Sequence, residues 1–134
     1  MHTLSIRTSE REQLIDITRE VQNLVNAQGW QDGMLLLYCP HTTGAVTINE
    51  GADPDVKRDI AVNMAKLVPL RGDYRHAEGN SDAHIKTSLF GPAQMLIVEN
   101  GEAMLGTWQV IYFCEFDGPR QRKLWAKFIG NSGA

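Results

Sequence analysis

The sequence predicts an α+β domain in which mixed, mostly antiparallel sheets carry two or three packed helices. Strand patterns dominate the C-terminal half, and helical spacings interrupt the strands in the first half. Asn100-Gly101 stands between two apolar runs and is the strongest hairpin signal in the chain. The chain of 134 residues has the size of one domain, so we expect a single domain over residues 1–134.

The first 29 residues predict two strands and a helix. Residues 3–7 (TLSIR) alternate apolar and polar side chains, as a half-buried strand does, and residues 13–17 (QLIDI) resemble its hairpin partner. Thr18 suits a helix N-cap, and Gly29 stands where a helix stops. Apolar residues follow between them at helical spacing: Val21, Leu24 and Val25.

The next segment predicts two buried strands and a longer helix. Residues 34–39 (MLLLYC) are continuously apolar, which is typical of a strand covered on both faces, and residues 45–48 (AVTI) form a short strand. The stretch 53–55 (DPD) marks a helix start, because an aspartate caps and a proline fits the first position. A buried stripe is expected at Val56, Ile60, Met64 and Leu67, with Pro69 ending the helix.

The remainder reads as a long loop, a short helix and several strands. Residues 69–80 form a polar loop, and residues 81–91 form a helix capped by Ser81 and closed by a glycine. Residues 93–99 form a strand, and the run after Asn100-Gly101 supplies one long strand or two. Residues 123–129 supply the last strand, which we expect to pair with its neighbour through the Gly118-Pro119 turn.

Net charge and the distribution of apolar residues argue against nucleic-acid and membrane partners. A net charge of −3 argues against nucleic acid, and the basic residues of the last third are interpreted as a solvated strand and turn: Arg120, Arg122, Lys123 and Lys127. No apolar run approaches the roughly 18 residues of a membrane span, and the N-terminus lacks a signal-peptide core. Cys39 and Cys114 lie in apolar runs, which predicts buried free thiols, a reducing compartment and therefore the cytoplasm.

Three histidines lie at element junctions or in the long loop: His41, His76 and His84. Three neutral imidazoles with one open position can hold a catalytic divalent metal such as zinc, with magnesium as the other candidate. Nearby carboxylates could complete or orient such a site: Glu50, Asp53, Asp73, Glu78 and Asp82. The spacings match no standard metal motif, so three structural or solvent-facing histidines remain an alternative.

Two polar segments and two basic residues add candidate ligand contacts. The hydroxyls of Thr42 and Thr43, at a turn between two apolar strands, can hold a phosphate oxygen, or simply close the turn. Arg75 and Lys86 flank two histidines and suit a phosphorylated substrate, or are solvated surface charges. Trp108, beside Thr107 and Gln109, can stack an aromatic ring, or is a buried tryptophan with a satisfied indole.

Three blocks of sequence resemble the YjbQ-like family, whose members are described as secondary thiamine-phosphate synthases. They are HTTGAVTINEGADPDV, GDYRHAEGNSDAHIKTSLFG and GTWQVIYFCEFDGPR, and the similarity extends over nearly the whole chain. The resemblance implies a compact α+β domain with a β-sandwich-like core that assembles as a homotrimer. It also implies a transferase that joins hydroxymethylpyrimidine diphosphate to thiazole phosphate and releases pyrophosphate, as a secondary activity.

The resemblance also assigns roles to residues. The family's histidines map onto His41, His76 and His84, and its acidic and amide positions onto Glu50, Asp53, Asn80 and Asp82. A divalent metal on the three histidines, with Glu50 or Asp82 as additional ligands, could clamp the diphosphate. The phosphate and ring contacts would then come from Thr42, Thr43, Lys86, Thr107, Trp108 and Gln109.

Two rival functions remain open at this stage. The same histidines could activate a water for a metal-dependent phosphate-ester hydrolase, with Glu50 as the base. The chain could also be a non-enzymatic trimer that binds a metal or a metabolite. Release of phosphate from simple esters would favour the first rival, and tight binding without turnover would favour the second.

Overall fold

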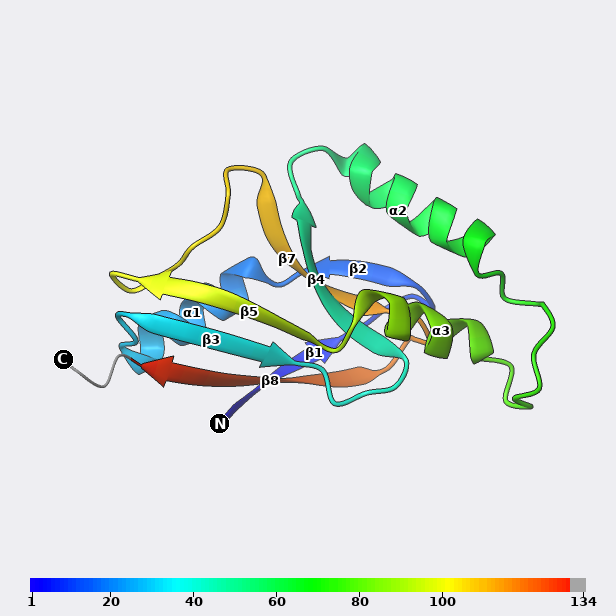
Figure 1. Cartoon of the computed structure of the whole chain (residues 1–134), viewed down its shortest axis with the longest axis horizontal. Coiled ribbons are helices and arrows are strands. Elements are labelled where there is room, and N and C mark those ends of the chain that lie inside the picture. The colour runs from blue at the N-terminus through cyan, green and yellow to red at the C-terminus, as the bar shows by residue number, and fades with distance from the viewer. Residues whose placement is uncertain (131–134) are drawn as a thin grey trace.

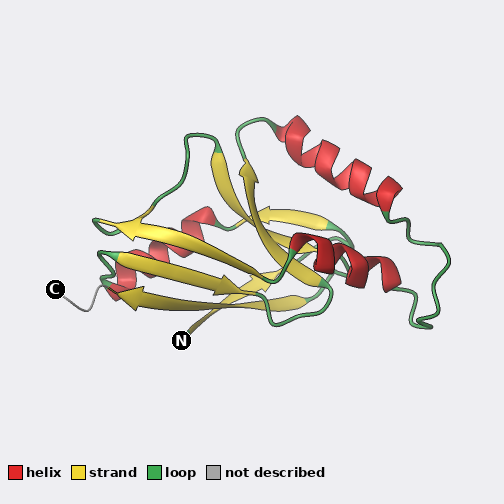
Figure 2. Cartoon of the chain, in the orientation of Figure 1, coloured by secondary structure: helices red, strands yellow, loops and turns green. Residues whose placement is uncertain are grey.

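The computed structural model describes residues 1–130, which fold into two antiparallel sheets and three helices (Figures 1 and 2). The larger sheet has the strand order β1-β8-β3-β5-β6, and the smaller has the order β2-β7-β4. This confirms the predicted α+β class. The strands are β1 (His2–Arg7), β2 (Gln13–Asp16), β3 (Gly33–Tyr38), β4 (Gly44–Glu50), β5 (Ala93–Glu99), β6 (Glu102–Ala103), β7 (Gln109–Glu115) and β8 (Gln121–Gly130). The helices are α1 (Thr18–Gln28), α2 (Pro54–Leu67) and α3 (Ser81–Phe90).

The main core lies between the two sheets, with α1 closing one side. Alternate residues of β3 and β5, such as Leu35 and Val98, meet Val21 of α1 and Phe113 of β7 there, and all four are fully buried. A second core forms on the opposite face of the smaller sheet, where Ala83 of α3 is buried. The smaller sheet is therefore covered on both faces, and α3 is fixed against it.

The outer face of the larger sheet is apolar and uncovered. Met34 of β3 lies between Ile97 of β5 and Ile129 of β8, and these side chains are 43, 57 and 54 % exposed. The prediction that residues 34–39 are covered on both faces is therefore wrong. The outward-pointing side chains of β3 are apolar, as are those that point into the core. The sequence of β3 therefore lacks the alternation of apolar and polar residues that would indicate one exposed face.

Two predicted strand pairings are also wrong. Residues 13–16 form β2, but β2 pairs with β7 in the smaller sheet, whereas β1 pairs with β8 in the larger one. The turn at Gly118-Pro119 likewise connects β7 to β8 across the two sheets and not within a hairpin. In both cases the chain changes sheets at a short turn, so neighbours in sequence are not neighbours in a sheet.

Helix α2 lies at the edge of the domain (Figure 1). Its predicted start is confirmed, because the Asp53 carboxylate accepts the backbone N–H of Asp55 at 2.9 Å and Pro54 takes the first helical position. The predicted buried stripe is wrong: no residue of α2 is fully buried, and Leu67 is 71 % exposed. Ile60 is its partly buried contact with the second core.

The local turn signals give most of the remaining boundaries. Asn100 and Gly101 have φ angles of 50° and 77°, as a type I′ hairpin turn requires, and Gly29 ends α1 with a φ of 67°. The predicted caps at Thr18 and Ser81 are displaced by one residue, since Ile17 and Asn80 take the N-cap positions. Within residues 1–130, no helix is long and apolar enough to cross a membrane.

Candidate functional site

Two histidines meet at a surface pocket near the start of α3. His76 comes from the loop after α2 and His84 from the first turns of α3, and their ring centroids lie 5.2 Å apart, edge to face. His76 is exposed and His84 is half-buried. The pocket has a volume of about 370 Å³ and is also lined by Asp73, Tyr74, Arg75, Ser81 and Ile85.

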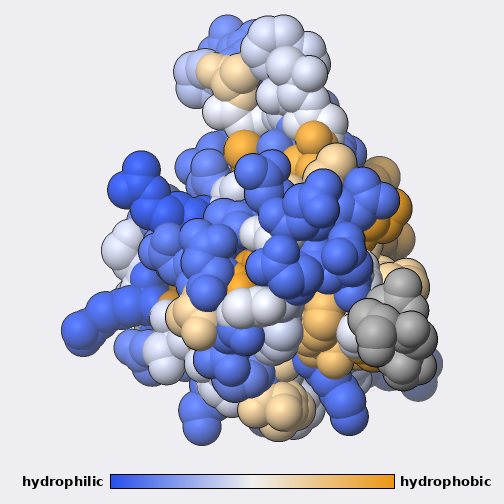
Figure 3. Space-filling view, turned by 90° about the vertical axis from the view of Figure 1, so that its left-hand side faces the viewer, coloured by the Kyte–Doolittle hydropathy of each residue, from blue (hydrophilic) through white to orange (hydrophobic). Residues whose placement is uncertain are grey.

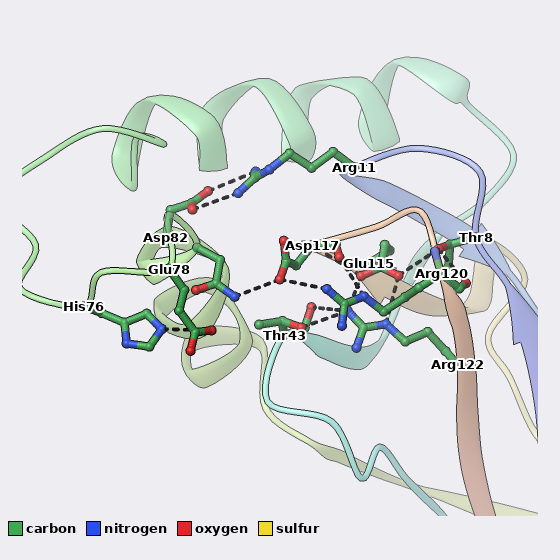
Figure 4. Close-up of polar contacts among 11 residues, drawn as sticks. Thr8, Arg11, Thr43, His76, Glu78, Asp82, Glu115, Asp117, Arg120 and Arg122 are labelled. Carbon is green, nitrogen blue, oxygen red and sulfur yellow. Dashed lines mark hydrogen bonds and ion pairs between the residues drawn. The ribbon is translucent and has the colours of Figure 1, made fainter.

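The two rings are available to a ligand because little else holds them. His76 Nε2 lies 3.7 Å from a carboxylate oxygen of Glu78, and both side chains are open to solvent (Figure 4). An ion pair of that kind contributes little to stability. Imidazoles in this setting can bind a metal, accept or donate a proton, or hydrogen-bond a phosphate.

Behind the pocket, a buried network of ion pairs fixes α3. Asp82 is fully buried; its two oxygens accept from Arg11 at 3.0 Å and from Lys86 at 3.1 Å, and Lys86 also contacts Glu12. Burial acts to raise the pKa of Asp82, but the hydrogen bonds from Arg11 and Lys86 outweigh it and lower the pKa. The Lys86 side chain is 1 % exposed, so it helps to fix α3 and does not reach the pocket surface.

A second buried network holds the threonine turn. Arg122 is 2 % exposed and pairs with the buried Glu115, while its Nη2 donates to the hydroxyl and carbonyl of Thr43 at 2.8 and 3.2 Å (Figure 4). Thr8 donates to the same carboxylate at 2.8 Å. Burial acts to raise the pKa of Glu115, but the bonds from Arg122 outweigh it and lower the pKa. The Thr43 hydroxyl is therefore already engaged, and the prediction that Arg122 is solvated is wrong.

His41 does not join the other two histidines. Its Nε2 accepts the backbone N–H of Lys123 at 3.0 Å, so the neutral ring carries its proton on Nδ1. Burial, and then the positive charge of Arg122, lower the pKa of His41. Among residues 1–130, no three histidine, cysteine, aspartate or glutamate side chains are grouped closely enough to hold a metal ion.

A second pocket lies at the start of α2. It has a volume of about 460 Å³ and is lined by Glu50, Ala52, Asp53, Pro54 and Trp108. The backbone N–H of Gly51 donates to the carbonyl of Trp108 at 2.9 Å, so the fold brings together the NEGADP and GTWQ blocks. The indole is 62 % exposed, which leaves it free to stack a ring and excludes the buried alternative.

The remaining predicted residues lie in varied surroundings. Gln109 accepts the N–H of Gly106 at 2.7 Å and holds the turn before β7. Thr42 and Thr107 are exposed. The side-chain amide of Asn80 donates to Asp117 at 2.8 Å at the start of α3, and its amide oxygen Oδ1 is buried without a partner in the described chain.

The residues that the sequence reasoning missed are the buried charges. Glu115 directly follows the apolar run VIYFC, and Arg11 stands in the charged stretch SERE. An acid that interrupts an apolar run indicates a buried polar group that needs a partner, so Glu115 carried a usable signal. The partner, Arg122, could not be chosen from sequence, because it lies on a strand of the other sheet.

Comparison with known proteins agrees with this fold and these blocks. The family model of the UPF0047, YjbQ-like proteins matches residues 2–131. The chain belongs to this family. It is 51 % identical over 131 residues to the UPF0047 protein YugU of Bacillus subtilis, covering 97 % of this chain and 99 % of that protein. It is 48 % identical over 126 residues to a UPF0047 protein of Methanocaldococcus jannaschii, covering 94 % and 91 %.

Solved structures of other proteins share the fold. The crystal structure of a YjbQ/UPF0047 protein from Clostridium acetobutylicum superposes with a TM-score of 0.93 at 56 % identity, covering 96 % of this chain and 100 % of that one. A protein from Aeropyrum pernix gives a TM-score of 0.92 at 34 % identity, covering 97 % and 98 %. The two-sheet architecture therefore persists while two thirds of the residues change.

Proposed function

We propose that this family member is a transferase that joins hydroxymethylpyrimidine diphosphate to thiazole phosphate, as thiamine-phosphate synthases do. The observation that carries the proposal is the pair His76 and His84, which lie 5.2 Å apart in a pocket that also contains Arg75. Imidazoles beside a guanidinium favour a phosphorylated ligand, because all three groups can donate to phosphate oxygens.

The reaction makes modest demands on the protein. The bond between the pyrimidinylmethyl carbon and its oxygen breaks, and pyrophosphate leaves with the electron pair. The lone pair of the thiazole nitrogen then forms the new carbon–nitrogen bond. The catalyst must neutralise the leaving group and align the two substrates, and no protein nucleophile takes part. Arg75 and the two histidines supply donors to the pyrophosphate.

The pocket offers some, but not all, of the protein ligands that a divalent metal would need. One chain offers the imidazoles of His76 and His84, whereas catalytic zinc usually has three protein ligands. Substrate oxygens or a neighbouring copy would complete the set. When bound, such a metal supplies Lewis-acid stabilisation of the leaving pyrophosphate. His41 is not needed as a ligand in this scheme, because its Nε2 already accepts the N–H of Lys123.

The proposal includes assembly as a homotrimer. The apolar outer face of the larger sheet carries Met34, Met95, Ile97 and Ile129, all more than two-fifths exposed. Hydrophobic residues gather toward the right-hand edge of Figure 3, while the rest of that end of the molecule is largely hydrophilic. Patches of this kind mark protein interfaces. We expect light scattering to give about 45 kDa, three times the 15.0 kDa of one chain.

Assembly also bears on the completeness of the site. The pocket at Trp108 lies at the start of α2, whereas the pocket at His84 is lined by the loop that follows the end of α2 and by the start of α3. The 14 residues of α2 span about 21 Å, which is more than a small substrate covers. The two pockets therefore serve a single reaction only when one copy faces another.

A coupling assay tests the proposal. Purified protein is incubated with both substrates, with and without a chelator, and thiamine phosphate and pyrophosphate are quantified. Equal amounts of the two products are expected. His84→Asn should lower the rate at least about 100-fold if the ring contributes to general acid–base or electrostatic catalysis. His2→Asn is the matched control, because His2 packs on Trp30 and not in the pocket.

The rival functions give different results in the same assay. Inorganic phosphate released from a simple phosphate ester, without the thiazole substrate, would show a hydrolase. Saturable binding of either substrate with no product would show a binding protein. Loss of thiamine phosphate with chelator supports the metal, whereas product that persists removes the metal from the mechanism.

A further inference from the structure

The pocket at Trp108 has a composition that is distinct from that of the histidine pocket. Two of its five lining residues, Glu50 and Asp53, are carboxylates, and none of the five is basic. Trp108 is 62 % exposed, although a side chain of this size is mostly buried in folded proteins. An open indole beside two negative charges is unsuited to a phosphate and suited to a flat, positively charged group.

The backbone of Trp108 is held in place by hydrogen bonds on both sides. The Trp108 carbonyl accepts the N–H of Gly51 at 2.9 Å, which ties the β6–β7 loop to the end of β4. Gln109 closes the same turn, since its side chain accepts the N–H of Gly106 at 2.7 Å and its own N–H donates to the Gly106 carbonyl at 3.1 Å. The backbone on both sides of Trp108 is therefore held, and the ring remains open.

The start of α2 opposes the negative charge only weakly. A helix N-terminus carries the equivalent of roughly half a positive charge and offers free N–H groups to anions. Here Pro54 has no N–H, and the N–H of Asp55 is taken by the Asp53 carboxylate. Glu50 and Asp53 together contribute two formal negative charges, so the pocket stays negative.

We propose that this pocket binds a cationic heteroaromatic ring, with the ring stacked on Trp108 and its charge facing Glu50. The inference rests on the proposed function for the source of the ring, which would be the thiazolium that forms when the thiazole nitrogen is alkylated. The pocket then stabilises the positive charge that develops on one substrate, while the histidine pocket of a facing copy holds the negative leaving group. The recognised chemistry is the positive charge on a flat ring.

Tryptophan N–H signals in a nitrogen–proton correlation spectrum report on this pocket directly. The chain has three tryptophans, and the Trp108 signal is the one lost in Trp108→Leu. The probes are 1-methylnicotinamide, a flat pyridinium cation, and nicotinamide, its neutral counterpart of similar shape. Trp30 and Trp125 serve as internal references, because they stack on Phe128 and Tyr38 in the larger sheet.

The cation is expected to move the Trp108 signal saturably and to leave the other two in place. The neutral compound should bind about 2–5-fold more weakly, as expected of one exposed cation–π contact. Glu50→Gln should reduce that preference, because the carboxylate that faces the charge is lost, and raising the salt concentration should reduce it as well. Asp59→Asn is the matched control, because Asp59 is an exposed carboxylate of α2 outside the pocket.

Equal shifts with both compounds, or a Trp108 signal that does not move with the cation, would overturn this proposal. Its failure can be told apart from failure of the proposed function. Cation binding without any thiamine phosphate in the coupling assay leaves the pocket assignment standing and overturns the transferase. Thiamine phosphate formation by a protein that shows no preference for the cation overturns the pocket assignment and leaves the transferase standing.

Discussion

Replacing Arg122 by leucine tests whether the buried network holds the fold in place. The guanidinium provides two charged hydrogen bonds to Glu115 and two more to Thr43. The substitution leaves a fully buried carboxylate with the Thr8 hydroxyl and the N–H of Asp117 as its remaining donors. Breaking a buried ion pair in this way costs about 3–5 kcal/mol, because the other charge remains unpaired.

Two measurements check this magnitude. Urea denaturation at pH 7 and fixed protein concentration should show a free energy of unfolding about 3–5 kcal/mol below that of the wild type. Thermal denaturation should show a midpoint lower by about 10–20 °C for a chain of this size. The double variant Glu115→Leu/Arg122→Met should recover most of the loss, since a buried pair replaced by apolar side chains is often neutral.

The pH dependence gives an independent check. Arg122 lowers the pKa of Glu115, so its contribution is present above the pKa of about 4.3 of the unfolded chain and is lost as the pH falls through the folded pKa. In Arg122→Leu, protonation relieves the unpaired carboxylate, so the difference from the wild type should shrink between pH 7 and pH 4. A single variant within about 0.5 kcal/mol of the wild type at pH 7 would refute the reasoning, because surface substitutions cost no more.

Three further outcomes follow from the structure. Burial lowers the pKa of His41, so the unfolded chain protonates first and stability should fall as the pH drops below about 6.5. His41→Gln should flatten that slope in urea midpoints measured from pH 7 to 5.5, and an unchanged slope would contradict the assignment. Gly51→Ala places a Cβ 2.4 Å from Val110 Cγ1 and should cost about 1–3 kcal/mol in thermal denaturation, whereas a stability equal to the wild type would rule out the clash. Ile97→Glu puts a charge on the apolar sheet face and should reduce the particle mass in light scattering to the 15.0 kDa monomer, still folded because Ile97 is 57 % exposed; an unchanged mass would place the interface elsewhere.

The sequence predicted the elements whose signals are local. Asn100-Gly101 specifies its turn by backbone geometry, and the segment 53–55 specifies a helix start by its own hydrogen bonds. The pairing of β2 and of β8 was not predictable in this way, because the chain changes sheets at short turns. Strand pairing depends on which faces are buried together, and that is decided by residues far away in sequence.

The same difference between local and distant signals applies to the residues of the candidate site. His76 and His84 are eight positions apart and meet through one loop and one helix, so their proximity was accessible from sequence. His41 was grouped with them by residue type, but its contact with the backbone of Lys123 depends on the placement of β8. Lys86 resembled a phosphate ligand. Asp82, four positions earlier on the same helix, was a local signal of an ion pair, but the other partner, Glu12, lies far away in sequence.

The comparison of wild type and His84→Asn in the coupling assay tests the central claim most directly. Both proteins are given hydroxymethylpyrimidine diphosphate and thiazole phosphate at equal, saturating concentrations, and thiamine phosphate is measured over time. The proposal predicts product from the wild type and a rate lower by about 100-fold or more in the variant. Equal rates in the two proteins, or no product from the wild type, would contradict it.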